Sequence, residues 1–147
     1  MAEEATVAGR VAWVEGLQFV GQAAKSKGTV VLDGPQELGG LEGGMRPMEA
    51  LLLSLAGCTG MDVISVLLKK RQPVTGFWVH VQGHRADEHP RRYERITLEY
   101  VVRGHDVAAE AVERAIELSS TKYCGVTASL NAEISHTYRI EQEEAQA

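Results

Sequence analysis

Cys58 and Cys124, the two cysteines of this 147-residue chain, are the residues best suited to chemistry. The N-terminus is acidic and lacks an apolar segment of signal-peptide length, so nothing in it predicts export. In a protein that is not exported both thiols are expected to be reduced, and a bond between them would be transient and catalytic rather than structural. The alternative is that each cysteine is a small apolar filler of the core. The separation of the two cysteines matches no local metal or Cys-x-x-Cys motif, so their spacing does not decide between a redox pair and core filler.

The histidines form no recognisable metal motif. His80 and His84 share one face of a predicted strand and His89 lies in the turn that follows, but this is not the spacing of a zinc site. His136 falls on the apolar face of the last predicted strand and is interpreted as a satisfied core residue. No Ser/His/Asp arrangement and no glycine-rich loop between a strand and a helix supports a hydrolase or nucleotide-binding function. The sequence therefore predicts no metal site.

Composition narrows the class of protein and its partners. Hydrophobic residues make up 44% of the chain and charged residues 24%, which is typical of a soluble globular protein. The net charge is −5 and the basic residues are scattered, so no nucleic-acid partner is predicted. The length suits one domain, residues 1–147. We expect an ordered core over about 10–140, frayed acidic ends and a cytoplasmic location.

The order of predicted elements favours an α+β fold, β-β-β-α-β-β-α-(α)-β, because strands and helices are grouped rather than alternating. Short alternating or apolar runs separated by turn residues predict the strands, and periodic apolar stripes predict the helices. The predicted strands are 10–14, 17–23, 29–32, 76–82, 94–102 and 132–140, and the predicted helices are 48–68, 107–120 and 123–130. Asp106 is the expected N-cap of the second helix.

The first predicted helix is apolar on nearly every face. Its few polar side chains are Glu49, Ser54, Thr59, Asp62 and Ser65. Glu49 and Asp62 leave only twelve uncharged residues between them, too few for a bilayer core, so we expect no membrane span. A soluble helix of this kind must be enclosed on all sides. One small domain has too little sheet to do this, so the sequence predicts a homodimer in which a second copy supplies the missing wall.

Two cysteine-containing segments resemble the OsmC/Ohr family. The first is residues 47–63, Pro-Met-Glu-Ala-Leu-Leu-Leu-Ser-Leu-Ala-Gly-Cys-Thr-Gly-Met-Asp-Val, and the second is residues 122–130, Lys-Tyr-Cys-Gly-Val-Thr-Ala-Ser-Leu. The opening residues 10–17 and the turn at 30–34 resemble the YhfA-type branch in particular. The likeness covers nearly the whole chain.

The resemblance implies a tightly interwoven homodimer whose sheets enclose two long central helices, with Cys58 facing Cys124 near the subunit interface. It implies oxidative-stress defence by a peroxidase, in which Cys58 attacks a hydroperoxide and becomes a sulfenic acid. Cys124 then condenses with it to a disulfide, and an external thiol reductant restores both thiols without a bound cofactor. The apolar side chains of Leu52, Leu55 and Met61 would suit an organic hydroperoxide better than hydrogen peroxide.

The activating residues of the family do not transfer to this chain. The family's arginine position holds Val14, and its glutamate position holds Met48, with Glu49 one residue late and turned by about 100 degrees on the helix. Asp62, one turn after Cys58, would oppose thiolate formation if ionised. Gly125 stands where many relatives have proline or serine. These departures favour the alternative function, a protein of the same fold that binds a small ligand or senses redox state with little or no peroxidase activity.

Overall fold

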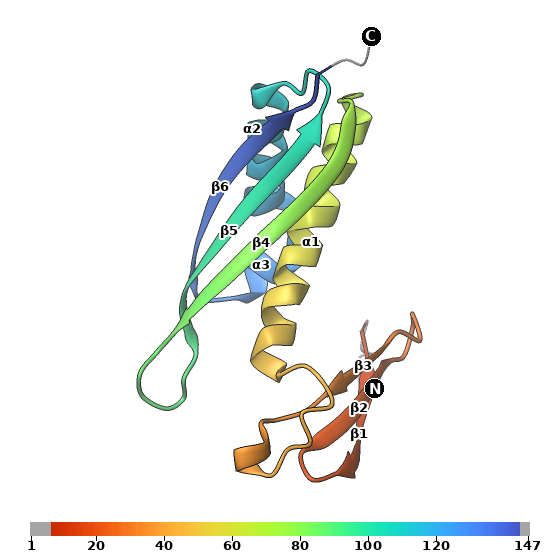
Figure 1. Ribbon diagram of the computed structural model, residues 1–147, viewed down its shortest axis with the longest axis vertical. Coiled ribbons are helices and arrows are strands. Elements are labelled where there is room, and N and C mark those ends of the chain that lie inside the picture. The colour runs from red at the N-terminus through yellow and green to blue at the C-terminus, as the bar shows by residue number, and fades with distance from the viewer. Residues whose placement is uncertain (1–6, 145–147) are drawn as a thin grey trace, which may run out of the picture. The chain divides into compact units, whose positions relative to one another are not determined.

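The computed structural model describes residues 7–144 and shows two compact units, Met1–Leu51 and Leu52–Ala147. The long helix α1 (Pro47–Lys69) contributes its first residues to one unit and the rest to the other (Figure 1). The α+β class and the predicted order of elements are confirmed. Residues 1–6 and 145–147, which include most of the predicted frayed ends, lie outside the described part of the chain.

The first unit is an antiparallel meander. It consists of β1 (Gly9–Glu15), β2 (Gln18–Ala23) and β3 (Thr29–Leu32), paired in sequence order. The loop that follows, predicted as irregular, contains a short 3₁₀ helix, η1 (Gln36–Leu38).

Asp33 organises this loop. Its buried carboxylate accepts backbone N–H groups from Gly34, Leu41 and Gly43, at 2.7, 3.1 and 3.0 Å, and the Gln18 amide at 3.1 Å. Burial opposes ionisation, but the four donors outweigh it and lower the pKa of Asp33 to about 2.

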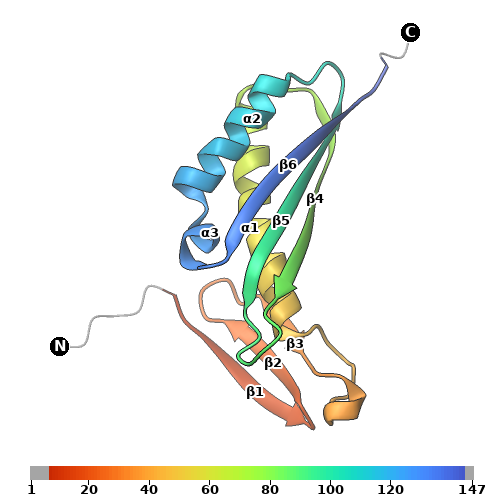
Figure 2. The same ribbon diagram turned by 90° about the vertical axis from the view of Figure 1, so that its left-hand side faces the viewer.

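The second unit is a three-stranded sheet covered on one face by helices (Figure 2). β4 (Val74–Arg85) and β5 (Tyr93–Gly104) are antiparallel, whereas β6 (Glu133–Gln142) runs parallel to β5. A parallel neighbour requires a crossover. The crossover is made by α2 (Ala109–Leu118), a π-helical turn η2 (Ser119–Tyr123) and α3 (Gly125–Ser129).

The core of this unit lies between β5 and the helices. One face of α1 contributes Leu55, Val63 and Leu67, which are fully buried. The alternate residues of β5 from Ile96 to Val102 are also buried, as period-2 alternation requires on the covered face of a sheet. By length and composition α1 could cross a membrane, which is weak evidence by itself, and about a third of its apolar stretch (33%) is buried in the structure.

Several element bounds differ from the predictions. β4 and β5 are longer at both ends than the predicted strands 76–82 and 94–102. α2 begins at Ala109, and Asp106 is not its N-cap but lies in the left-handed region with φ of 60°. The N–H of Ala108, which directly precedes α2, donates to the distant Gln72 side chain, and the N–H of Val107 donates to Gln142.

The last strand also runs two residues further than predicted. Glu141, expected in the frayed tail, belongs to β6 and accepts two hydrogen bonds from the Arg103 guanidinium at 2.8 and 2.9 Å. Both hydrogen bonds go to the same carboxylate oxygen, and they join the end of β6 to β5.

Candidate redox site

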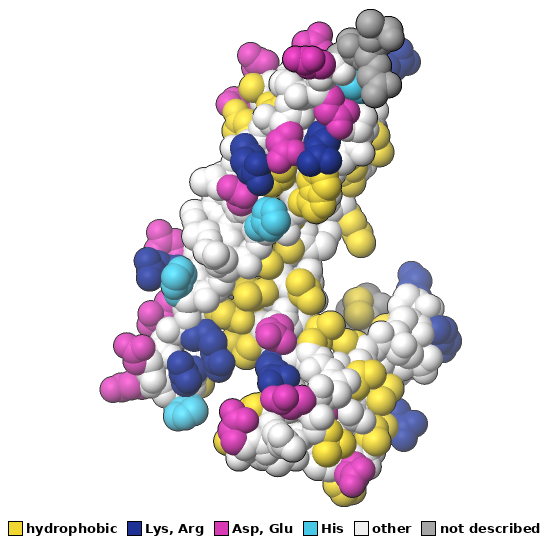
Figure 3. Space-filling view, in the orientation of Figure 1, with side chains coloured by type: hydrophobic (Ala, Val, Ile, Leu, Met, Phe, Trp, Pro, Cys, Tyr) yellow, Lys and Arg dark blue, Asp and Glu magenta, His cyan; other side chains and the backbone are white. Residues whose placement is uncertain are grey.

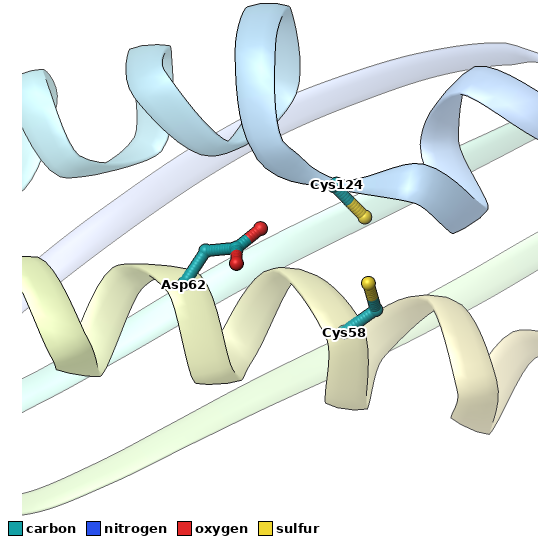
Figure 4. A group of neighbouring side chains, drawn as sticks. All are labelled: Cys58, Asp62 and Cys124. Carbon is teal, nitrogen blue, oxygen red and sulfur yellow. The ribbon is translucent and has the colours of Figure 1, made fainter.

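The structure brings Cys58 and Cys124 together. Their sulfur atoms and a carboxylate oxygen of Asp62 all lie within 4.8 Å of one another. Figure 4 shows the side chains of Cys58 and Asp62 on α1 and that of Cys124 on the facing segment. Both thiols are free; Cys58 is half-buried and Cys124 is buried. A disulfide needs a sulfur–sulfur distance of about 2.05 Å, so bond formation here requires the two sulfur atoms to move closer together.

Local structure explains where each cysteine lies. Cys58 is in the middle of α1, and Asp62 follows one turn later on the same face, which places both side chains toward the crossover segment. Cys124 is the residue between the π-helical turn and α3. Its N–H donates to the Ser119 carbonyl at 2.9 Å, and its sulfur accepts the Thr127 N–H at 3.4 Å. The break between the two helical segments thus turns the Cys124 sulfur toward α1.

The surroundings of Cys58 disfavour its thiolate. The Val126 N–H donates toward the sulfur and lowers the pKa, but burial and the neighbouring Cys124 and Asp62 together raise the pKa of Cys58 above its ordinary value. Asp62 acts in the direction that the sequence predicted. No lysine or arginine of the described chain is among the groups that cause this shift.

A hydrogen-bonded chain of side chains runs from Asp62 to the far strand. Ser119 donates to Asp62 at 2.9 Å, Thr59 contacts Ser119 at 2.8 Å and Tyr100 at 2.7 Å, and Tyr100 contacts His136 Nδ1 at 3.0 Å. The three hydroxyl residues between the ends are fully buried. We call these five residues the Asp62 network.

The direction of every bond in the Asp62 network follows from counting protons. A hydroxyl has one hydrogen to donate. Because the Ser119 hydrogen goes to Asp62, Thr59 must donate to Ser119 and Tyr100 to Thr59, which leaves His136 Nδ1–H as the donor to Tyr100. All four hydrogens therefore point along the network in the direction of Asp62.

Titration at the far end agrees with this arrangement. Burial raises the pKa of Tyr100 to about 12, although its bond to Thr59 acts the other way. Burial lowers the pKa of His136, which keeps its ring neutral. The His136 ring also stacks on Tyr100 with centroids 5.9 Å apart.

The sequence did not reveal the Asp62 network. It placed Ser119 on a helical stripe and His136 on a strand face without joining them. Two polar residues within apolar patterns could have indicated the network. Thr59 lies in the long apolar helix, and Ser119 lies on the apolar stripe of the predicted helix 107–120.

The three predicted substrate-contacting side chains lie in different environments. Leu55 is fully buried in the core, Leu52 is half-buried, and Met61 is 73% exposed. All three residues lie on α1, and their contact with a substrate stays a prediction. Gly125, next to Cys124, faces open space. A Cβ atom at this position would meet no other atom, so glycine is not needed there to avoid a clash.

The family follows from a comparison with known proteins. The family described as OsmC-like protein matches residues 39–139, most of the second unit and both cysteines. This chain belongs to the OsmC-like protein family, as the two cysteine segments predicted.

Individual relatives and solved structures show which members of the family the chain is similar to. Protein YhfA of Escherichia coli strain K12 is 38% identical over 133 residues, covering 89% of this chain and 96% of YhfA, which confirms the predicted resemblance to that branch. A solved hypothetical protein from Aquifex aeolicus VF5 is 30% identical with a TM-score of 0.82, covering 96% of this chain and 100% of the other. An organic hydroperoxide resistance protein OsmC from Legionella pneumophila is 11% identical with a TM-score of 0.65, covering 95% and 99%, and shares the fold alone.

Proposed function

We propose that this protein is a thiol-dependent peroxidase that reduces organic hydroperoxides in cytoplasmic defence against oxidative stress. The observation that carries the proposal is the approach of the Cys58 and Cys124 sulfurs to within 4.8 Å. Two cysteines used only as core filler have no reason to meet. Proteins of the same fold from Legionella pneumophila and Elizabethkingia anophelis are described as organic hydroperoxide resistance proteins, which supports the substrate class.

The reaction uses the two sulfurs in sequence. The Cys58 thiolate attacks one peroxide oxygen, the O–O bond breaks, and the alkoxide leaves with a proton as an alcohol, which oxidises Cys58 to a sulfenic acid. The Cys124 thiol then attacks the Cys58 sulfur, and the sulfenic hydroxyl leaves with the Cys124 proton as water. Two external thiols, or one dithiol, reduce the resulting disulfide by thiol–disulfide exchange.

We assign Cys58 the attacking role because it is the more accessible sulfur. Cys58 is half-buried, whereas Cys124 is buried and held by the Thr127 N–H. A hydroperoxide therefore meets Cys58 first, and Cys124 is positioned behind it to resolve the sulfenic acid. The surroundings that raise the pKa of Cys58 make this a slow peroxidase, since only the thiolate attacks.

The same raised pKa supports a second candidate function. A protein of this fold whose Cys58 is mostly protonated at neutral pH would bind a small apolar or thiol ligand, or sense redox state, with little peroxidase turnover. The rate of the first oxidation step separates the two functions.

Exposed apolar side chains support a homodimer as the working form. On α1, Leu53, Met61 and Leu68 are exposed and recur at intervals of eight and seven residues, so they form one stripe. Gly57 lies in the same stripe and faces open space. The three-stranded sheet of the first unit also carries exposed Val, Leu, Phe and Trp side chains, and hydrophobic surface is visible on each unit in Figure 3. Surfaces of this kind are characteristic of protein–protein interfaces.

Mass spectrometry tests the proposed peroxidase. Reduced protein is mixed with one equivalent of cumene hydroperoxide, and rapid loss of two hydrogens, about 2 Da, with a Cys58–Cys124 peptide is expected. The Cys124→Ser variant is expected to stop at a sulfenic acid that a trapping reagent captures, and Cys58→Ser is expected to remain unmodified. Oxidation no faster than that of a free thiol in the same buffer would favour the second function.

A further inference from the structure

The redox site has the composition of a metal site as well as of a dithiol. The atoms that converge within 4.8 Å are two sulfurs and a carboxylate oxygen, from Cys58, Cys124 and Asp62. Thiolates and carboxylates both bind Zn²⁺, at about 2.3 Å and about 2.0–2.2 Å respectively. In tetrahedral geometry these bond lengths put the two sulfurs about 3.8 Å apart. The present separation therefore requires only small rotations of the side chains.

Three groups that can carry negative charge converge at this site. With both thiols ionised, two thiolates and a carboxylate meet within 4.8 Å of one another. Like charges at this distance repel unless a cation lies between them. A thiophilic divalent cation at the centre of the three groups would offset this repulsion.

The Asp62 network supplies the support that a metal ligand needs. Ser119 donates to one carboxylate oxygen of Asp62, and Thr59 and Tyr100 continue the chain behind it in the buried core. Outer hydrogen bonds of this kind fix the orientation of a ligand. Ser119 orients the Asp62 carboxylate, and Thr59 in turn orients the Ser119 hydroxyl.

We propose that the reduced protein binds one thiophilic divalent cation, of which Zn²⁺ is the probe, through Cys58, Cys124 and the carboxylate of Asp62. Three protein ligands leave the fourth tetrahedral position to water or an external thiol. Binding releases the two thiol protons. The proposal uses the same reduced cysteine pair as the proposed peroxidase but does not depend on turnover.

Metal binding and disulfide formation exclude each other, because both use the same sulfur lone pairs. The bound cation would shield Cys58 from hydroperoxide, and oxidation to the disulfide would release the cation. The site would then exchange a metal ion for a disulfide according to the supply of oxidant.

Calorimetric titration of tag-free, reduced, full-length protein with Zn²⁺ under anaerobic conditions tests the proposal. We expect one ion per chain and, from titrations in buffers of different ionisation enthalpy, release of two protons. Asp62→Asn is expected to weaken binding by more than about 10-fold, the lower effect of removing an outer-shell partner. Glu94→Gln, which removes an exposed carboxylate of β5, is the matched control and is expected to bind as wild type.

Cobalt(II) gives a readout independent of affinity. A thiolate-to-cobalt charge-transfer band is expected in the reduced wild-type protein and is expected to be absent in Cys58→Ser and in the wild-type disulfide form. The disulfide form needs no mutation, so it separates loss of the site from a folding defect.

The metal proposal is overturned if Zn²⁺ does not bind at tens of micromolar, if the disulfide form binds equally, or if Asp62→Asn and Glu94→Gln have the same affinity. Its failure is distinct from failure of the peroxidase. A protein that forms the disulfide rapidly but binds no Zn²⁺ overturns the metal site alone. A protein that binds Zn²⁺ but does not react with hydroperoxide overturns the peroxidase alone.

Discussion

Asp62→Asn is expected to make Cys58 react faster with hydroperoxide in metal-free buffer. The substitution removes one negative charge but keeps an oxygen that can accept the Ser119 hydroxyl, so the network geometry is retained. At 4.8 Å, the outer limit of the separation, two unit charges interact by about 0.9 kcal/mol with the dielectric constant of water and about 3.5 kcal/mol at an effective value of 20.

The lower part of that range applies because both side chains are half-buried and reach solvent. About 1 to 2 kcal/mol corresponds to a roughly 5- to 30-fold larger thiolate population at neutral pH. A less basic thiolate is also a weaker nucleophile, with a Brønsted coefficient of about 0.5 for thiol exchange. The net gain in rate is therefore about 2- to 6-fold.

The difference in oxidation rate between Asp62→Asn and wild type is expected to depend on pH. Asp62 raises the pKa of Cys58, so the variant should react faster than wild type at pH values below the wild-type pKa of Cys58. Above that pKa Cys58 is a thiolate in both proteins, and the variant loses its rate advantage. Alkylation quench followed by mass spectrometry measures the rate of Cys58 oxidation between about pH 6 and about pH 10. Glu94→Gln is again the control and should follow wild type. A variant slower than wild type at every pH would refute the electrostatic reasoning and identify Asp62 as a proton acceptor in the reaction.

Three further outcomes follow from burial and hydrogen bonding. Thr59→Val leaves the buried Tyr100 hydroxyl hydrogen without its acceptor and removes one donor from Ser119. It is expected to lower the free energy of unfolding in urea by about 1–3 kcal/mol, whereas the exposed Thr75→Val should change it by less than about 0.5 kcal/mol. Equal costs would contradict the network. Met61→Glu is expected to abolish self-association in sedimentation experiments. The melting temperature of the monomer should stay nearly unchanged, because Met61 is 73% exposed. If the variant still dimerises, α1 is not part of the interface. Asp33→Asn is expected to destabilise the protein near neutral pH. The pKa of Asp33 is lowered to about 2 in the folded protein. The stability advantage of the wild type over the variant is therefore fully present above the unfolded pKa near 3.9 and disappears as the pH falls through about 2. Urea unfolding midpoints at several pH values measure this difference. A difference that does not depend on pH would contradict this account.

The sequence alone predicted the order of the elements and the family. Apolar periodicity and turn residues are local signals, so they located α1 to within one or two residues, from Pro47 to Lys69. The same local character explains the errors. The start of α2 was misplaced, and the N–H groups of the two residues before the helix pair with Gln72 and Gln142, more than thirty residues away along the chain.

Only the tertiary structure assembled the site. The bonds of the Asp62 network join residues separated by 36 to 60 positions, so no window of sequence contains them. A buried hydroxyl must find a partner wherever the fold provides one, and the choice depends on the register of β5 with β6 and on the π-helical turn before Cys124. The sequence named the two cysteines and the opposing Asp62, whereas the folded chain decided that all three converge and that a line of four hydrogen bonds joins Asp62 to the last strand.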